Sequence, residues 1–190
     1  MEYGICLHSV IPVRFEPSHK SEMVTQILFG ELFQITERLN TWCKVKLSFD
    51  QYEGWIDALQ ASQLDETEYL RLLNSETSVT IDLVQLLSHE TERTMLPIII
   101  GSSLPAMEES RFRIAQSLFY YEGLVSESLL NRSIINPPDT QITRQQLLED
   151  AMLYLNAPYL WGGRTPFGLD CSGFVQMVYK LQGIKLFRDA

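Results

Sequence analysis

The amino-acid sequence predicts an α+β protein in which two small β-barrels are followed by two helices. Short strand-like runs separated by turn residues fill residues 4–64, and further runs lie between residues 78 and 130. Closely spaced short strands are typical of small barrels. After residue 136 the apolar residues change to helical spacing. This change of period divides a strand-rich part from a helical end.

The first predicted domain covers residues 1–64. Alternate residues within 42–49 are apolar, and this period of two indicates a half-buried strand. Pro12 interrupts the run at residues 10–13. Because proline has no N–H to donate to a neighbouring strand, this position suggests an edge strand. Gly30 divides a further apolar run into a strand pair. These features together predict one small barrel.

The second predicted domain covers residues 65–135. Asp65 is the expected N-cap of a linker helix that ends near Leu73. Three strand-like runs rich in β-branched and aromatic residues then follow, at residues 79–87, 95–100 and 112–119. We interpret them as a second, diverged barrel. A helical alternative stays open for residues 83–87 and 114–121, whose composition also suits a helix.

The third predicted domain covers residues 136–190 and begins with a linker, Asn136–Asp139. Thr143 and Gln146 have the spacing of a capping box, which predicts a helix start. The helix should end near Asn156, because Pro158 cannot lie inside it. Its expected apolar stripe consists of Leu147, Leu148, Ala151, Tyr154 and Leu155.

Cys171 stands where a loop rich in glycine and proline enters a second predicted helix. Asp170 is the expected N-cap, and Gly183 lies just past the helix end. Phe174, Val175, Val178 and Leu181 have the spacing of one apolar face. The first turn of a helix has unpaired N–H groups and the positive end of the helix dipole, which favour a thiolate and an oxyanion. The alternative is a buried structural cysteine, the commoner state of a free cysteine.

The residues around Cys171 resemble the nucleophile region of the NlpC family of cell-wall cysteine peptidases. Two motifs carry the resemblance, Tyr159–Gly163 and Asp170–Phe174. It implies a papain-like core that hydrolyses bonds around the D-glutamyl residue of bacterial peptidoglycan peptides. The first domain is similar to a bacterial SH3-like domain, through Val13-Arg14, Ser21-Glu22, Gly30-Glu31, Trp42–Val45 and Gly54–Ile56.

The resemblance also implies roles for single residues near the nucleophile. Cys171 would attack the scissile carbonyl and form a thioester, while Tyr159 and Trp161 would contact the substrate. Asp170 and Ser172 flank the nucleophile and would grip the substrate, and Arg164 would bind a substrate carboxylate. The alternatives are aromatic core packing for Tyr159 and Trp161, a simple helix cap for Asp170, and a solvated loop residue for Arg164.

In related multi-domain enzymes the SH3-like domain closes one end of the cleft, so that only peptides with a free N-terminal L-Ala fit. We expect Tyr52 to form this wall and Glu31 to supply a carboxylate for the peptide amine. Both could equally be ordinary surface residues. The expected activity is therefore hydrolysis of the γ-D-glutamyl-L-diamino acid bond of murein peptides, in cell-wall peptide recycling or turnover.

A cysteine nucleophile needs a general base, usually histidine, with a polar group to orient it. In the resembled family both come from strands after the cysteine-bearing helix, yet no histidine follows His89 and Ala190 lies only 19 residues after Cys171. We therefore expect a truncated catalytic domain, inactive alone, with a degraded relative as the alternative. Two other functions stay open, a non-catalytic module that binds wall peptides or a protein, and a thiol acyltransferase on the same core.

Composition limits the partners that the chain can have. A net charge of −9 disfavours nucleic acid and anionic lipid. The three cysteines and three histidines are too widely spaced to suggest a disulfide framework or a metal site, so no cofactor is expected. No signal peptide precedes the first domain, which suggests a cytoplasmic protein, or a periplasmic or extracellular one if a leader was removed.

Overall fold

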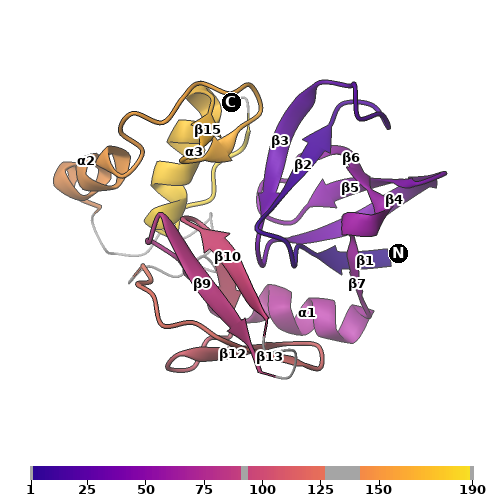
Figure 1. Cartoon of the computed structure of the whole chain (residues 1–190), viewed down its shortest axis with the longest axis horizontal. Coiled ribbons are helices and arrows are strands. Elements are labelled where there is room, and N and C mark those ends of the chain that lie inside the picture. The colour runs from indigo at the N-terminus through magenta and orange to yellow at the C-terminus, as the bar shows by residue number, and fades with distance from the viewer. Residues whose placement is uncertain (1, 91–93, 127–141, 189–190) are drawn as a thin grey trace.

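The computed structural model describes residues 2–90, 94–126 and 142–188. The first part is a seven-stranded antiparallel sheet with the strand order β3-β2-β6-β5-β4-β1-β7 (Figure 1). Its strands are β1 (Glu2–Ile5), β2 (Val10–Arg14), β3 (Met23–Leu28), β4 (Leu32–Leu39), β5 (Trp42–Leu47), β6 (Glu53–Asp57) and β7 (Ser62–Leu64), with a 3-10 turn at Ala58–Gln60.

This sheet confirms the predicted strands but not a closed barrel. Within the described residues, no pairing joins the end strands β3 and β7. Cys43, Val45 and Leu47 of β5 are buried, as the alternation predicted. The edge position expected for Pro12 is wrong, since β2 lies between β3 and β6. Because β2 pairs with β6 only at Arg14, the missing N–H of Pro12 disrupts no ladder there.

Helix α1 (Glu66–Asn74) follows the first sheet and begins where the sequence predicted. Asp65 is its N-cap, and the carboxylate accepts a hydrogen bond from the N–H of Glu68 at 2.8 Å. Tyr69 and Leu72 are the buried residues of the helix. Figure 1 shows α1 between the first sheet and the strands that follow it.

The second part consists of a four-stranded sheet, β10-β9-β13-β12, and a separate pair, β11-β8. The strands are β8 (Thr77–Val79), β9 (Val84–His89), β10 (Met95–Ile99), β11 (Ser103–Pro105), β12 (Arg111–Ile114) and β13 (Ser117–Tyr120). A second closed barrel is therefore not seen in the part that the structure describes. The helical alternative is wrong, and residues 112–119 form a hairpin that turns at Ala115 with a φ of 50°.

The C-terminal part contains α2 (Arg144–Met152), α3 (Cys171–Leu181) and the short pair β14 (Arg164–Thr165) and β15 (Gly168–Leu169). The capping box of Thr143 and Gln146 is confirmed, whereas the predicted linker at residues 136–139 lies outside the described residues. Helix α2 ends at Met152 rather than Asn156, because turns replace the helix over the last four residues.

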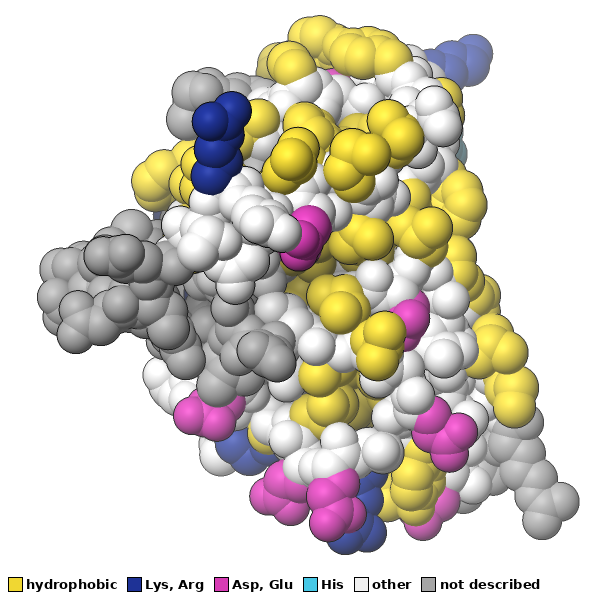
Figure 2. Space-filling model, turned by 90° about the vertical axis from the view of Figure 1, so that its left-hand side faces the viewer, with side chains coloured by type: hydrophobic (Ala, Val, Ile, Leu, Met, Phe, Trp, Pro, Cys, Tyr) yellow, Lys and Arg dark blue, Asp and Glu magenta, His cyan; other side chains and the backbone are white. Residues whose placement is uncertain are grey.

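Not every predicted apolar face is buried. Leu148 and Leu155 of the expected α2 stripe are exposed, and so is Val175 of α3. Figure 2 shows hydrophobic side chains spread over the side of the molecule that carries these two helices, most densely at its upper end. None of the described helices is long and apolar enough to cross a membrane.

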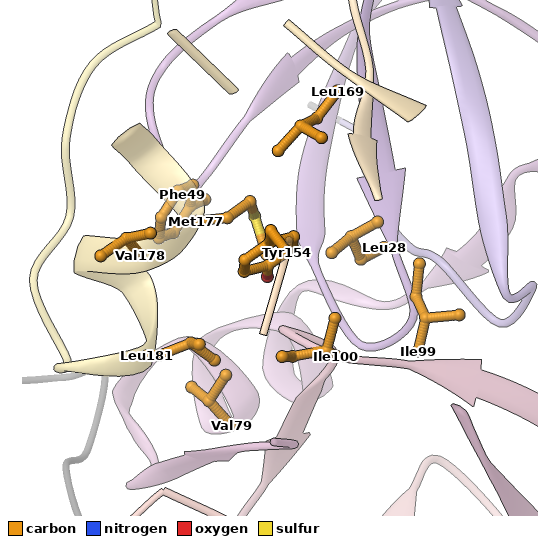
Figure 3. Packing of buried hydrophobic residues seen from close by; sticks show 10 residues of the cluster. All are labelled: Leu28, Phe49, Val79, Ile99, Ile100, Tyr154, Leu169, Met177, Val178 and Leu181. Atoms are coloured by element: carbon orange, nitrogen blue, oxygen red, sulfur yellow. The ribbon is translucent and has the colours of Figure 1, made fainter. Parts of the chain in front are cut away.

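One hydrophobic cluster joins all three parts of the chain (Figure 3). Leu28 and Phe49 come from the first part, Val79, Ile99 and Ile100 from the second, and Tyr154, Leu169, Met177, Val178 and Leu181 from the C-terminal part. All ten side chains are buried. Helix α3 is thus packed against both preceding parts, and this packing fixes where Cys171 stands.

Candidate active site

Cys171 is the first residue of α3, as predicted, and it is exposed. Asp170 is the N-cap, with extended backbone at a φ of −99° and a ψ of −178°. Its Oδ1 accepts a hydrogen bond from the N–H of Gly173 at 2.7 Å. The thiol therefore lies at the end of the helix where free amides and the dipole favour negative charge.

The carboxylate of Asp170 holds more than the helix start. Its Oδ1 also accepts from the hydroxyl of Ser172 at 3.2 Å, and its Oδ2 accepts from the N–H of Gly162 at 2.8 Å. The guanidinium of Arg188 donates to Oδ2 at 2.6 Å. Both oxygens are engaged by protein donors in a buried position, so the geometry favours the helix-cap role over a contact with a substrate amine.

A pocket of about 120 Å³ lies beside Cys171. The first sheet and the C-terminal part line it together, with Glu22, Val24, Tyr52, Tyr159, Trp161, Asp170, Cys171 and Ser172. Six of the eight predicted site residues are therefore brought together. Tyr159 and Trp161 are 68% and 60% exposed, so core packing does not explain them.

Sequence reasoning missed two residues of the pocket, Glu22 and Val24. Oε1 of Glu22 accepts a hydrogen bond from Nε1 of Trp161 at 2.6 Å. The motif Ser21-Glu22 contributed to the SH3-like resemblance but received no role in the site. A lone surface carboxylate has no local signal of function, and only the fold brings it across 139 positions to Trp161.

The loop before Cys171 lies directly against β3. Gly162 has a φ of +73°, and a Cβ atom there would lie 2.3 Å from the carbonyl oxygen of Met23. The loop is closed by a hydrogen bond from the N–H of Leu160 to the carbonyl of Leu169 at 3.1 Å. Only glycine permits both this backbone conformation and this approach. Gly162 thereby sets the position of the neighbouring Trp161.

Glu31 and Arg164 do not line the pocket, which corrects the expected substrate contacts. Their side chains are 3% and 0% exposed and form a buried ion pair. The guanidinium of Arg164 donates to Oε1 of Glu31 at 2.9 Å and to Oε2 at 3.0 Å. A substrate carboxylate or amine cannot approach either group in this arrangement.

Residues 156–190 match the family model described as NlpC/P60, and residues 13–60 match the one described as the bacterial dipeptidyl-peptidase SH3 domain. The two matches include Cys171 and the Tyr52 wall of the pocket. The segment that carries Cys171 is thus similar to the NlpC/P60 family.

Two curated relatives of this chain are named peptidases. Dipeptidyl-peptidase 6 of Lysinibacillus sphaericus is 28% identical over 185 residues, which cover 92% of this chain and 68% of that protein. The gamma-D-glutamyl-L-lysine dipeptidyl-peptidase of Bacillus subtilis is 26% identical, with 98% of this chain and 58% of that protein covered. The chain thus spans about three fifths to two thirds of these relatives.

A solved NlpC/P60 family protein from Bacillus cereus has the same fold, with a TM-score of 0.78 at 19% identity. The likeness covers all of this chain and 75% of that one. A second solved structure, an NlpC/P60 endopeptidase from Photobacterium damselae, gives a TM-score of 0.63 at 18% identity. At these identities the likeness concerns the fold alone.

The pocket contains the exposed thiol of Cys171 and polar neighbours but no histidine among its lining residues. The described residues also contain no group of three or more histidine, cysteine, aspartate or glutamate side chains that could hold a metal. The chemistry that this arrangement offers is therefore that of a thiol at a helix N-terminus beside a small, partly aromatic pocket.

Proposed function

We propose that this protein is a cysteine peptidase that hydrolyses the γ-D-glutamyl-L-diamino acid bond of murein peptides with a free N-terminal L-Ala. One observation carries the proposal: Cys171 begins α3 and shares a pocket with Glu22 and Tyr52 of the first sheet. The pocket is thus bounded on one side by a different part of the chain, as a site for the end of a short peptide requires. The name of the Bacillus subtilis relative supports this choice of bond.

The first chemical step is attack of the Cys171 sulfur on the scissile carbonyl carbon. The thiol proton passes to a general base, and the carbonyl oxygen becomes an oxyanion that the free amides at the start of α3 stabilise. Collapse of this intermediate releases the amine of the diamino acid and leaves a thioester. Water then cleaves the thioester and restores the thiol. No lining residue of the pocket is the base, which the family resemblance places after the cysteine-bearing helix.

Glu22 replaces Glu31 as the carboxylate that we assign to the substrate amine. It is exposed and lines the pocket, and among residues 2–90, 94–126 and 142–188 its carboxylate is engaged only at Oε1, by Trp161. A free Oε2 can accept a charge-assisted hydrogen bond from an ammonium group. Tyr52 closes the same side of the pocket. A peptide whose Ala amine is blocked would lose this contact and meet the wall.

We further infer that the first sheet, residues 1–64, is the SH3-like domain, that residues 65–135 form the diverged second one, and that α2 and α3 belong to a papain-like core. The match of residues 13–60 to the SH3 model supports the first of these assignments. Recycling of cell-wall peptides in the cytoplasm is the setting that fits a requirement for a free amine.

The decisive experiment measures cleavage of L-Ala-γ-D-Glu-diaminopimelate by the full-length gene product. Cys171→Ala should lower turnover by at least about 10³-fold while the circular dichroism spectrum stays unchanged. Limited alkylation with iodoacetamide should label Cys171 first, since Cys6 and Cys43 are buried and serve as internal controls. Unchanged cleavage by Cys171→Ala would refute the nucleophile assignment.

A second candidate, a non-catalytic module that binds murein peptides, is favoured by one observation, the absence of histidine among the lining residues of the pocket. Binding of the same peptide without cleavage, by both wild type and Cys171→Ala, would identify the module. Cleavage that depends on Cys171 would identify the enzyme.

A further inference from the structure

The strongest feature outside the pocket is a buried cluster of charges between the first sheet and the C-terminal part. We propose that Glu31 is a positioning residue, whose carboxylate holds the loop before Cys171 and the far end of α3 in register with the pocket wall of the first sheet. This inference rests on the proposed function, because it concerns the same site.

One carboxylate makes both attachments. Arg164, seven residues before Cys171, forms a two-pronged ion pair with Glu31 at 2.9 and 3.0 Å. Lys180, nine residues after Cys171, donates from Nζ to Oε1 of Glu31 at 2.6 Å. The side chains of both cations are 0% exposed. Glu31 itself is fixed by the N–H of Leu28, which donates to Oε2 at 2.8 Å.

The attachment of Arg164 continues onto β3. Its Nη1 donates to the carbonyl of Gln26 at 2.7 Å, and its backbone N–H donates to Oε1 of Gln26 at 2.7 Å. Val24, two residues before Gln26 on β3, lines the pocket, and Glu22 lies two residues further back and also lines it. The two hydrogen bonds between Arg164 and Gln26 therefore fix the position of the loop before Cys171 on β3, which directly follows Glu22.

The signs of the charges divide between the two parts of the chain. In this cluster the two anions, Glu31 and Asp50, come from the first part, and the two cations, Arg164 and Lys180, come from the C-terminal part. A separate buried pair, Asp170 and Arg188, lies within the C-terminal part. Asp50 accepts a hydrogen bond from Gln176 of α3 at 2.8 Å. The two negative charges of the first part thus balance the two positive charges of the C-terminal part across the interface.

The ring of Phe49 lies under both cations of this cluster, 5.2 Å from the guanidinium carbon of Arg164 and 4.7 Å from Nζ of Lys180. Burial alone would raise the pKa of Glu31, but Arg164 and Lys180 outweigh it and hold the pKa at about 2. Glu31 is thus an anion at neutral pH, and the lowered pKa of Lys180, about 8, still leaves this side chain protonated there.

A buried ion cluster of this kind is weak evidence of a stabilising role, because well-packed apolar residues often replace one without loss of stability. Apolar residues, however, do not make directional contacts. The ion pairs do, and they permit only one position of α3 and the loop against the first sheet. Helix α3 is rigid, so an error at Lys180 is carried over about 13 Å of helix to Cys171. The cluster therefore determines the separation of the thiol from Glu22 and Tyr52.

The test compares an apolar replacement of the ion-paired residues Glu31, Arg164 and Lys180 with the wild type, and leaves Asp50 with its hydrogen bond from Gln176. The triple variant Glu31→Met, Arg164→Met and Lys180→Met removes all three charges at similar volume. It should keep a cooperative urea transition, yet lower kcat by about 100-fold, since small misplacements of reacting groups have effects of that size. Selectivity for free over acetylated substrate should fall about tenfold. Glu53→Gln, which loses only a surface pair with Lys44, is the matched control.

A second readout does not depend on peptidase activity. Cys171 is alkylated in parallel with cationic 2-bromoethylamine and neutral iodoacetamide, and the ratio of the two rates reports how close the thiol lies to the carboxylate of Glu22. The ratio should fall several-fold in the triple variant and in Glu22→Gln, but not in Glu53→Gln. If cleavage did not depend on Cys171, the proposed function would be overturned, but the ratio of alkylation rates would be unaffected.

If the triple variant had the same kcat, selectivity and alkylation ratio as the wild type, the positioning role would be overturned. If the triple variant does not fold, Lys180→Met decides, because it leaves the Arg164–Glu31 pair intact. We expect a fall of about tenfold in kcat and a lower alkylation ratio for Lys180→Met. Wild-type values of both would equally overturn the proposal.

Discussion

The indole Nε1 of Trp161 donates a hydrogen bond to Oε1 of Glu22 at 2.6 Å. Trp161 belongs to the loop before Cys171, and Glu22 precedes the first residue of β3. The bond thus joins the two parts of the chain that line the pocket. It orients the carboxylate and leaves Oε2 for a ligand, which makes Glu22 a direct test of how the pocket selects its substrate.

Glu22→Gln should reduce the preference for substrates with a free amine. The amide can still accept the indole hydrogen bond, but it no longer carries the charge that an ammonium group needs, so the Michaelis constant for L-Ala-γ-D-Glu-diaminopimelate should rise about tenfold or more. Steady-state kinetics with free and acetylated peptides measure the effect. Glu16→Gln, an exposed change in the same stretch, is the control, and equal selectivity in both variants would contradict the assignment.

Gly162→Ala should displace the loop that carries Trp161. The new Cβ would lie 2.3 Å from the carbonyl oxygen of Met23, and alanine is strained at a φ of +73°. We expect a loss of about 2 kcal/mol or more in the free energy of unfolding, together with altered alkylation of Cys171. Urea unfolding measures the first effect. Gly183→Ala has the same φ but follows the far end of α3, so it should reproduce only the strain.

Asp170 and Arg188 should behave as a coupled pair in a double-mutant cycle. Arg188→Met removes a buried partner at 2.6 Å, and Asp170→Asn weakens the helix cap and leaves the guanidinium without a counter-charge. Each change should cost about 3 kcal/mol in the free energy of unfolding, while the double variant costs clearly less than the sum. Strictly additive values from urea unfolding would show that the two side chains do not interact.

The stability of the protein should fall in acid partly through Glu31. Its folded pKa of about 2 lies below the ordinary value of 4.5, so its contribution is complete above pH 4.5 and is lost as the pH falls towards 2. Unfolding free energies measured from pH 6 to pH 3 should therefore decline less steeply in Glu31→Gln than in the wild type. Parallel slopes would argue against the ion pairs, and Glu53→Gln should follow the wild type.

Several other groups face this cluster and enter the same pH profile. Burial lowers the pKa of Lys180 to about 8 against the opposing effect of Glu31, so Lys180 stays protonated throughout the acid range. The remaining titratable or charged neighbours are Arg164, Lys185, Asp50, Cys6 and Tyr154. Arg164 and Lys180 keep their charge below pH 6, so the loss of stability in acid that we assign to this cluster comes from Glu31.

Features with short-range causes could be predicted from the sequence. Asp65, Thr143 and Asp170 cap the helices that they were expected to cap, because a cap depends on a side chain and the next three amides. The alternation in β5 likewise follows from one strand with one buried face. The placement of Cys171 at a helix start therefore needed only the residues around it.

Features that depend on contacts between distant residues could not be predicted from the sequence. The ion pair of Glu31 and Arg164 joins residues 133 positions apart, and each alone reads as a surface charge. Glu22 was missed for the same reason. The end of α2 was misplaced because Tyr154 turns into the core shared by all three parts, a contact that no local periodicity reveals. Barrel closure depends on pairing between distant strands, which the turn pattern does not determine.

The division of buried charge at the interface limits how this architecture can be recombined. In the described part of the chain, Arg164 and Lys180 of the C-terminal part form their ion pairs with Glu31 of the first part, and Asp50 adds a second negative charge nearby. If the Cys171 segment were fused to an unrelated N-terminal module, Arg164 and Lys180 would be buried at the new interface without a counter-charge. Chimeras of this architecture should tolerate exchange only when Glu31 and Asp50 are transferred together with Arg164 and Lys180.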